Sequence, residues 1–128
     1  MRHIQIMSIA LAACLSLATA AARSQDEIAR GKTLTTNNCA VCHAFGQGEP
    51  NGQGPNLFGI IGRPLAAAPG FKYSAAMKAA AAGKVWDEKL LDQWLTDTQV
   101  VAPGNAMTYF EGDEARRRKI IAYLRTLH

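Results

Sequence analysis

The sequence predicts a small all-α domain, and three features favour this class. Apolar residues recur every three or four positions near both ends of the domain, as amphipathic helices require. No segment of the domain alternates in the way that a half-buried strand does. The chain is short, with 128 residues, of which 48% are hydrophobic and 19% charged, and nothing in it suggests repeats or disorder. We therefore expect about four helices joined by long loops.

The first 22 residues are predicted to form a signal peptide, and the domain is predicted to span residues 23–128. A short basic start precedes an apolar, alanine-rich run, and the small residues Ala18–Ala20 or Ala20–Ala22 suit a signal peptidase. The run is shorter than the ~20 residues that cross a bilayer, so no stable membrane insertion is expected. Leu11–Cys14 resembles a lipoprotein processing box, which makes lipidation at Cys14 the alternative. Either way the protein is expected to be exported, with the periplasm as its location.

The first and last helices of the domain are expected to cross. Ser24–Glu27 has the form of a capping box, which predicts a helix from about Gln25 to Asn37. Gly31 in that helix permits close approach by another helix. The last helix is capped by Asp113. Its apolar stripe consists of Ile120, Tyr123, Leu124 and Leu127.

Two shorter helices are expected between them. One covers residues 74–82 and stops at Gly83, and the other covers residues 87–96. Residues 44–71 are rich in Gly and Pro, which predicts a loop. A loop of this length is uncommon in a domain built only of protein. It is therefore expected to fold around a bound group.

Residues 38–43 read Asn-Cys-Ala-Val-Cys-His, and three chemistries use such a motif. A structural zinc ion needs four ligands, but the domain has no second cysteine pair and only His128 to spare. A redox dithiol normally lies between a strand and a helix, and no strand is expected. The third chemistry is haem c attachment, in which Cys39 and Cys42 add to two vinyl groups and His43 reaches the iron. The motif favours this third interpretation.

The domain contains two methionines, Met77 and Met107, that could supply the second axial ligand. A neutral thioether suits haem iron and raises its reduction potential. Met77 lies in an alanine-rich helix, where ordinary packing is the simpler interpretation. Met107 follows Pro103 and Gly104, which favour a loop that can place sulfur over the ring. Met107 is therefore the predicted ligand.

Taken together, six motifs in this order resemble the class I cytochromes c of mitochondrial and bacterial type. The motifs are Cys39–His43, Gly54–Leu57, Gly59–Arg63, Ala68–Ser74, Val85–Trp86 and Pro103–Met107. The resemblance covers nearly the whole domain. It implies the class I cytochrome c fold around one haem c, attached covalently through Cys39 and Cys42, with its iron held by His43 and Met107.

The resemblance also assigns supporting roles. It implies that the Pro55 carbonyl accepts the imidazole N–H of His43, which would fix the tautomer. The residues that match those binding the haem propionates are Arg63, Tyr73 and Trp86. The chain departs from the family pattern in places: Thr35 stands where an aromatic residue is usual, and Trp94 replaces a tyrosine near the axial sulfur. Gly112 falls one residue late after Met107, and the segment between Tyr73 and Trp86 is longer by two residues.

An iron closed by His43 and Met107 has no free position for substrate, which favours a soluble carrier of single electrons over an enzyme. The expected partners are redox proteins: a quinol–cytochrome c reductase, a terminal oxidase or a periplasmic dehydrogenase. A haem peroxidase or a gas-binding haem protein is the alternative if Met107 does not bind iron. The basic run Arg116–Lys119 is interpreted as a solvated helix face, helped by nearby acidic residues including Glu111, and not as a nucleic-acid site. A monomer is expected.

Overall fold

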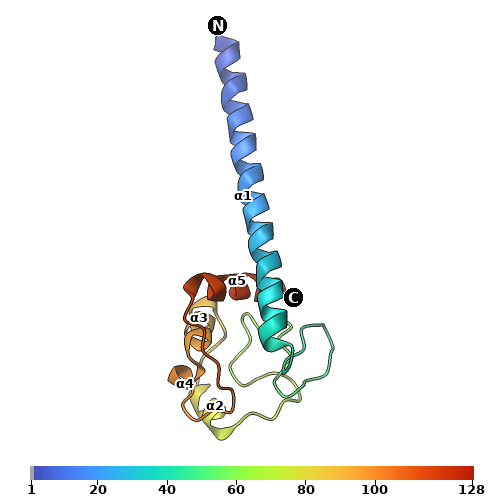
Figure 1. The fold of residues 1–128 in the computed structure, drawn as a ribbon, viewed down its shortest axis with the longest axis vertical. Coiled ribbons are helices and arrows are strands. Elements are labelled where there is room, and N and C mark those ends of the chain that lie inside the picture. Colours follow the sequence, from blue (N-terminus) through green and yellow to red (C-terminus); the bar gives the residue numbers. More distant parts are fainter. Residues whose placement is uncertain (1) are drawn as a thin grey trace.

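The computed structural model describes the backbone of residues 2–128 and the side chains of residues 19–128. Within that part of the chain, five helices are joined by loops (Figure 1). The helices are α1 (Arg2–Cys39), α2 (Ala75–Ala80), α3 (Glu88–Thr96), α4 (Thr98–Val101) and α5 (Glu114–Leu124). Strand pairing among these residues is limited to two isolated bridges, Pro64 with Val85 and Asp97 with Phe110. The all-α prediction is confirmed, with α4 as an additional short helix.

Helices α1 and α5 make the most extensive helix–helix contact, and Gly31 lies where they cross. A Cβ atom at Gly31 would overlap the Lys119 backbone oxygen and lie 2.7 Å from the Lys119 carbonyl carbon. It would also lie 3.0 Å from Tyr123 Cβ. Thr35, one turn later, is fully buried, and its hydroxyl donates to the Gly31 carbonyl at 2.8 Å. The predicted crossing at Gly31 is confirmed.

The shorter helices begin at side-chain caps. Ser74 Oγ accepts a hydrogen bond from the Met77 amide at 3.1 Å, and Asp87 Oδ1 accepts one from the Leu90 amide at 2.7 Å. Asp113 Oδ1 accepts from two amides of the first turn of α5, at 2.8 and 3.2 Å. These side chains satisfy N–H groups that have no partner inside a helix.

The predicted start of α1 at Ser24 is wrong for the chain as described. Helix α1 continues through this residue without interruption. Its upstream residues supply the carbonyl groups that accept the amide hydrogens a capping box would otherwise satisfy. Glu27, the other half of the expected box, instead pairs with Arg118 of α5 at 2.9 Å.

Residues 44–74 contain no helix, which confirms the predicted loop. Asn56 organises its first half, because its side-chain amide donates to the carbonyls of Gly46 and Glu49 at 2.8 and 2.9 Å. Its Oδ1 accepts from the Phe58 amide at 2.7 Å. The Asn56 amide in turn donates to Asn51 Oδ1 at 2.8 Å. Side-chain amides thus replace the backbone ladder that a regular element would provide.

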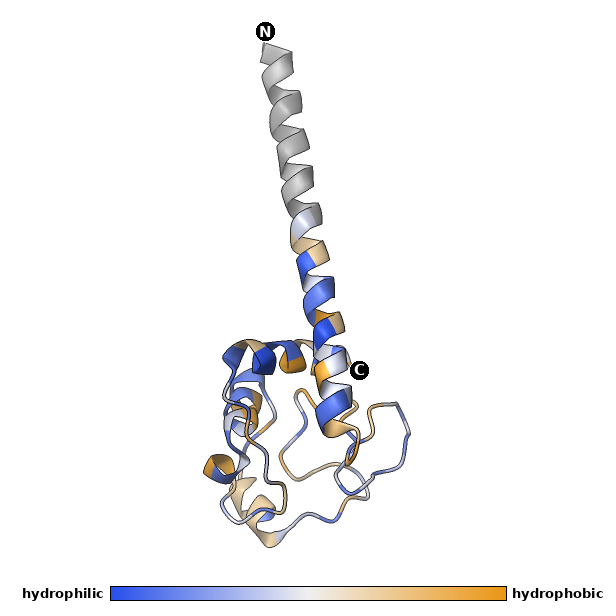
Figure 2. Cartoon of the chain, in the orientation of Figure 1, coloured by the Kyte–Doolittle hydropathy of each residue, from blue (hydrophilic) through white to orange (hydrophobic). Residues whose placement is uncertain are grey.

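The hydrophobic core is drawn from α2, α3, α5 and the loops. Figure 2 shows polar and apolar colours alternating along α3 and α5, as expected of helices with one buried face. The buried core residues are Ile60, Leu65, Met77, Trp86, Leu91, Trp94, Leu95, Ala102, Ile120, Ile121 and Leu124. Among the described residues, no helix is both long enough and apolar enough to cross a membrane.

Candidate functional site

Many of the same core residues line a cavity of about 520 Å³. All eight residues predicted for the site lie in its wall: Cys39, Cys42, His43, Pro55, Arg63, Tyr73, Trp86 and Met107. Cofactor sites commonly have volumes of ~300–1,000 Å³ and mostly apolar walls. The apolar part of this wall includes Leu57, Ile60, Leu91, Leu95, Ile120 and Leu124. The cavity therefore fits a largely apolar group with a few polar substituents.

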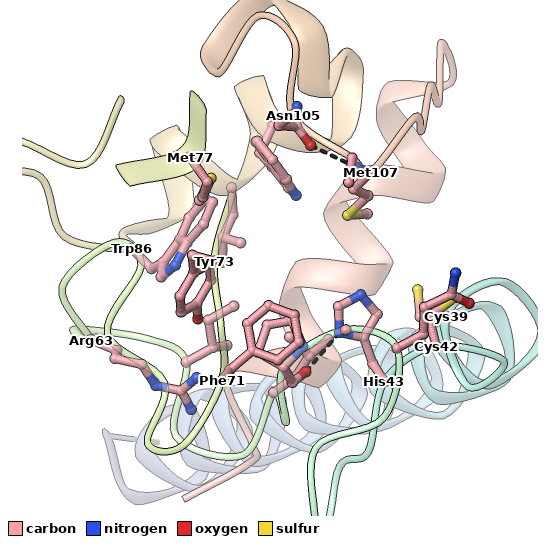
Figure 3. A pocket seen from close by; sticks show the side chains of 18 of the residues that line it. Cys39, Cys42, His43, Arg63, Phe71, Tyr73, Met77, Trp86, Asn105 and Met107 are labelled. Atoms are coloured by element: carbon pink, nitrogen blue, oxygen red, sulfur yellow. Dashed lines mark hydrogen bonds between the residues drawn. The ribbon is translucent and has the colours of Figure 1, made fainter. Parts of the chain in front are cut away.

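The two cysteines lie at one end of the cavity, where α1 ends. The amides of Cys42 and His43 donate to the Cys39 carbonyl at 3.0 and 2.9 Å, which closes a tight turn. Figure 3 shows both thiols and the imidazole on the same side of the cavity. Burial, together with the nearby Cys42 thiol, raises the pKa of the Cys39 thiol to about 11. A thiol with this pKa is neutral at pH 7, unlike the activated thiolate of a redox dithiol.

The His43 ring is held by the loop beside it. Its Nδ1 lies 2.7 Å from the Pro55 carbonyl oxygen, and because a carbonyl can only accept, Nδ1 carries the hydrogen. The lone pair of Nε2 then faces the cavity (Figure 3). Burial lowers the pKa of His43, and the hydrogen bond to Pro55 opposes this shift only in part. The lowered pKa favours the neutral ring that a metal requires. A Cβ atom on Gly54 would lie 2.7 Å from Nδ1, a constraint that the sequence analysis missed.

The two methionines lie in different surroundings, although both line the cavity. Figure 3 shows the Met107 side chain entering the cavity near the two cysteines and facing the imidazole of His43. Met77 is buried in the core, 7% exposed, and lies beside Trp86. Of the two sulfur atoms, that of Met107 is the one arranged opposite His43.

A network of side chains holds the segment that carries Met107. The Met107 amide donates to Asn105 Oδ1 at 2.8 Å, and its carbonyl accepts from the Thr98 hydroxyl at 2.6 Å and from Gln99 Nε2 at 3.2 Å. Asn105 Nδ2 donates to the Ala102 carbonyl at 2.7 Å. None of these three side chains was predicted from the sequence. An Asn two residues before an amide is the pattern of an Asx-turn, which could have identified Asn105. Nothing local pointed to Thr98 or Gln99.

Three polar side chains lie at the end of the cavity away from the cysteines (Figure 3). Arg63 donates to the carbonyls of Asn56, at 2.9 Å, and of Phe58. The Tyr73 hydroxyl accepts from the Ala68 amide at 3.2 Å, so its own hydrogen is free to donate. The indole N–H of Trp86 has no hydrogen-bond partner among the described residues. This end of the cavity therefore offers two free donors next to a positive charge.

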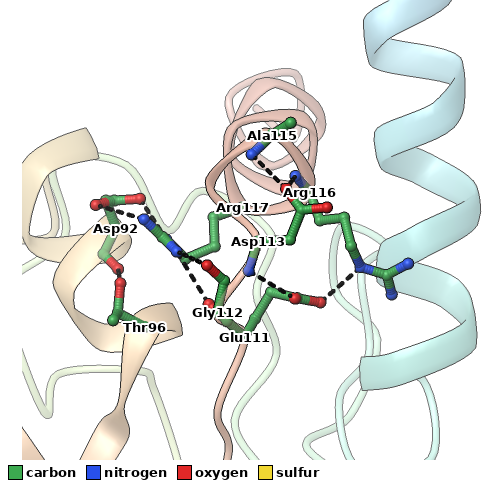
Figure 4. Close-up of polar contacts among 8 residues, drawn as sticks. All are labelled: Asp92, Thr96, Glu111, Gly112, Asp113, Ala115, Arg116 and Arg117. Atoms are coloured by element: carbon green, nitrogen blue, oxygen red, sulfur yellow. Dashed lines mark hydrogen bonds and ion pairs between the residues drawn. The ribbon is translucent and has the colours of Figure 1, made fainter.

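The basic run in α5 is occupied by ion pairs with three different parts of the chain. The pairs are Arg116–Glu111 at 2.7 Å, Arg117–Asp92 at 2.7 Å and Arg118–Glu27 at 2.9 Å. Figure 4 shows Arg117 reaching across to Asp92 of α3, and its Nη1 donates to the Glu111 and Gly112 carbonyls at 3.0 and 3.2 Å. The expectation of a solvated face is wrong for Arg117, which is 8% exposed. Because Arg116 and Arg118 are also paired with carboxylates, α5 does not present a row of free guanidinium groups.

Comparison with known proteins identifies the family of the chain. A family model described as "Cytochrome c" matches residues 28–128. Cytochrome c-550 of Novispirillum itersonii is 40% identical over 110 residues, which cover 79% of this chain and 98% of the relative. Cytochrome c2 of Rhodoblastus acidophilus is 44% identical over 88 residues, or 67% of this chain and 79% of the relative. Cytochrome c of Chlamydomonas reinhardtii is 36% identical over 110 residues, or 85% of this chain and 96% of the relative.

The attachment motif lies inside the matched region, and both of its thiols line a cavity of suitable size and polarity. The cofactor is therefore one haem c with its iron, attached covalently through Cys39 and Cys42. Proteins of the matched family are electron carriers rather than enzymes, and they exchange electrons with other redox proteins. On this evidence, the chain belongs to the cytochrome c family.

Proposed function

We propose that the chain is a periplasmic carrier of single electrons whose haem iron is held by His43 on one face and Met107 on the other. We further propose that it works between a quinol–cytochrome c reductase and a terminal oxidase or a periplasmic dehydrogenase. One observation carries the proposal: the Met107 side chain faces the free nitrogen of His43 across a cavity bordered by Cys39 and Cys42. When bound, the haem supplies an iron that gains and loses one electron.

His43 and Met107 would suit electron transfer, because the surrounding hydrogen bonds would hold both side chains in place when the iron changes its charge. The Pro55 carbonyl fixes the His43 ring through Nδ1, and this hydrogen bond strengthens donation from Nε2. The Met107 thioether is neutral and polarizable, which favours the reduced state. Together the two side chains would hold the iron and would keep water, peroxide and gases from binding to it. These residues would thus keep the structural change that accompanies electron transfer small.

The donors at the far end of the cavity support a role in holding the haem propionates. Burying a carboxylate is costly unless donors or a cation meet it. Tyr73 has a free hydroxyl hydrogen, Trp86 a free indole N–H, and Arg63 a charge that is oriented by two backbone carbonyls. We propose that these three residues bind the propionates.

Three observations support an exported domain that begins after residue 22. The family match starts at residue 28, and the side chains of residues 19–26 are exposed. The capping box at Ser24–Glu27, unused in the longer helix, would then lie close to the new amino terminus and could cap α1. Removal of residues 1–22 would leave the monomeric domain 23–128.

Replacement of Met107 by Ala tests the proposed ligand. The far-red ferric band that reports sulfur ligation should disappear, and the ferrous protein should bind carbon monoxide. The reduction potential should fall by roughly a tenth or more of the ~0.8 V span that axial ligands govern. Met77→Leu is the matched control, because it removes the other cavity sulfur while keeping its volume.

Two results would contradict the proposal. A far-red band that persists in Met107→Ala but is lost in Met77→Leu would make Met77 the ligand. Prompt binding of carbon monoxide by the unmodified ferrous protein would mean an open iron, and the peroxidase or gas-binding function would then be the better explanation.

A further inference from the structure

Thr98 is completely buried, and its polar groups are used by the segment that carries Met107. Its hydroxyl donates to the Met107 carbonyl at 2.6 Å and accepts from the Tyr109 amide at 3.2 Å. Its own backbone amide donates to the Tyr109 carbonyl at 3.2 Å. One residue therefore holds the chain on both sides of Thr108.

The carbonyl of Thr98 is also linked, through Asn105, to the amide of Met107. It accepts from Asn105 Nδ2 at 3.1 Å, and Asn105 Oδ1 in turn accepts from the Met107 amide at 2.8 Å. The N–H and the C=O of Met107 are thus both tied, directly or through one side chain, to the first residue of α4. A Ser or Thr hydroxyl in a helix usually bonds within its own helix. Thr35 does so, whereas Thr98 reaches across to another segment.

The apolar contacts of this segment are limited, because Met107 and Tyr109 pack against the core only as partly buried residues. Met107 is only partly buried, and its neighbours Ala106 and Thr108 are exposed. Phe110, which follows, is 71% exposed. A segment with few buried apolar contacts opens with a small free energy, so its hydrogen bonds decide how often it opens.

We infer that Thr98 is a positioning residue that sets how firmly the Met107 sulfur stays on the iron. The inference rests on the proposed function, because it requires Met107 to be an axial ligand. A buried hydroxyl is costly unless it is bonded, and both bonds of this hydroxyl end on the ligand segment. Replacing it by a methyl group of the same shape removes those bonds with little change in volume. The detached state of Met107 then becomes more populated.

The test compares three variants of the haem-loaded protein, Thr98→Val, Thr98→Ser and Thr35→Val. Carbon monoxide enters only when Met107 leaves, so its binding rate to the ferrous protein reports the detached population. Thr98→Val should bind carbon monoxide about tenfold faster, because the Tyr109 amide loses its acceptor and the Met107 carbonyl keeps only the hydrogen bond from Gln99 Nε2. Its ferric far-red band should weaken as well. Thr98→Ser keeps the hydroxyl and should stay close to the unmodified protein.

Thr35→Val is the matched control, because Thr35 is equally buried and its hydroxyl also makes a hydrogen bond, but away from the ligand segment. It should lose thermal stability without changing the binding rate or the band. The inference is overturned if Thr98→Val binds carbon monoxide no faster than Thr35→Val, or if Thr98→Ser behaves like Thr98→Val. If the unmodified protein lacks the band and binds carbon monoxide promptly, the proposed ligand itself has failed, which is a distinct result.

Amide exchange in the unmodified ferrous protein decides the matter if Thr98→Val does not fold. The Tyr109 amide, which donates to the Thr98 hydroxyl, should be protected and should exchange together with the Met107 amide. Rapid, independent exchange at Tyr109 would overturn the inference.

Discussion

Replacement of Gly31 by Ala tests the contact between α1 and α5. In an exposed helix interior this change stabilises a protein by about 1 kcal/mol, because Ala has the higher helix propensity. Here the added Cβ would overlap the Lys119 backbone oxygen and lie 2.7 Å from its carbonyl carbon. Both atoms belong to the backbone of α5, so no side-chain rotation can make room.

The destabilisation from the steric clash should exceed the gain in helix propensity. Overpacking of a well-packed core typically costs ~1–3 kcal/mol, and a clash with backbone should fall at the upper end. After subtraction of the ~1 kcal/mol propensity gain, the net loss is about 2 kcal/mol. For a domain of this size such a loss lowers the midpoint of thermal unfolding by roughly 10 °C.

The assay is thermal unfolding of the haem-loaded protein, followed by far-ultraviolet circular dichroism. Ala29→Gly is the paired control, since Ala29 is exposed on the same helix and the reverse change there should cost only the propensity term of ~1 kcal/mol. A Gly31→Ala protein as stable as the unmodified one, or more stable, would refute the close approach of the two helices.

Two further predictions concern the histidine loop and the amino terminus. In Gly54→Ala the new Cβ would lie 2.7 and 2.8 Å from the two ring nitrogens of His43. The ring should shift, the Nδ1 proton resonance of the ferrous protein should move, and thermal stability should fall. Gly112→Ala is the control, because its Cβ would lie 3.3 Å from an exposed Phe110 ring, and it should change neither the resonance nor the thermal stability. An unmoved Nδ1 resonance in Gly54→Ala would contradict the predicted contact. Mass spectrometry of the exported protein should find a chain that begins near residue 23, and a chain that still carries residue 1 would contradict the signal peptide.

Local patterns in the sequence were enough to predict the features that depend on neighbouring residues. Asp113 caps α5 because a carboxylate at this position meets the amides two and three residues further on, whatever surrounds it. The spacing of Cys39, Cys42 and His43 needs only one helical turn to bring the three side chains to the same wall. Gly31 was identified because a small residue on an apolar helix face usually marks a crossing.

The sequence could not predict features that arise from contacts between distant segments. The hydroxyl of Thr98 acts on Met107 and Tyr109, nine and eleven residues further on, and no periodic pattern records such a contact. The cap predicted at Ser24 is absent from the chain as described for the opposite reason. Its local pattern is genuine, but the residues before it continue the helix and leave nothing to cap.

The ion pairs of α5 also affect the electric field of the protein at long range. Each of Arg116, Arg117 and Arg118 has a carboxylate oxygen within 2.9 Å. Two opposite charges at contact act at long range as a dipole, whose field decays faster than that of a lone charge and is further screened by salt. The three arginines therefore contribute little to the distant field of a chain whose formal net charge is +4. Long-range attraction of an acidic partner therefore gains little from these three arginines.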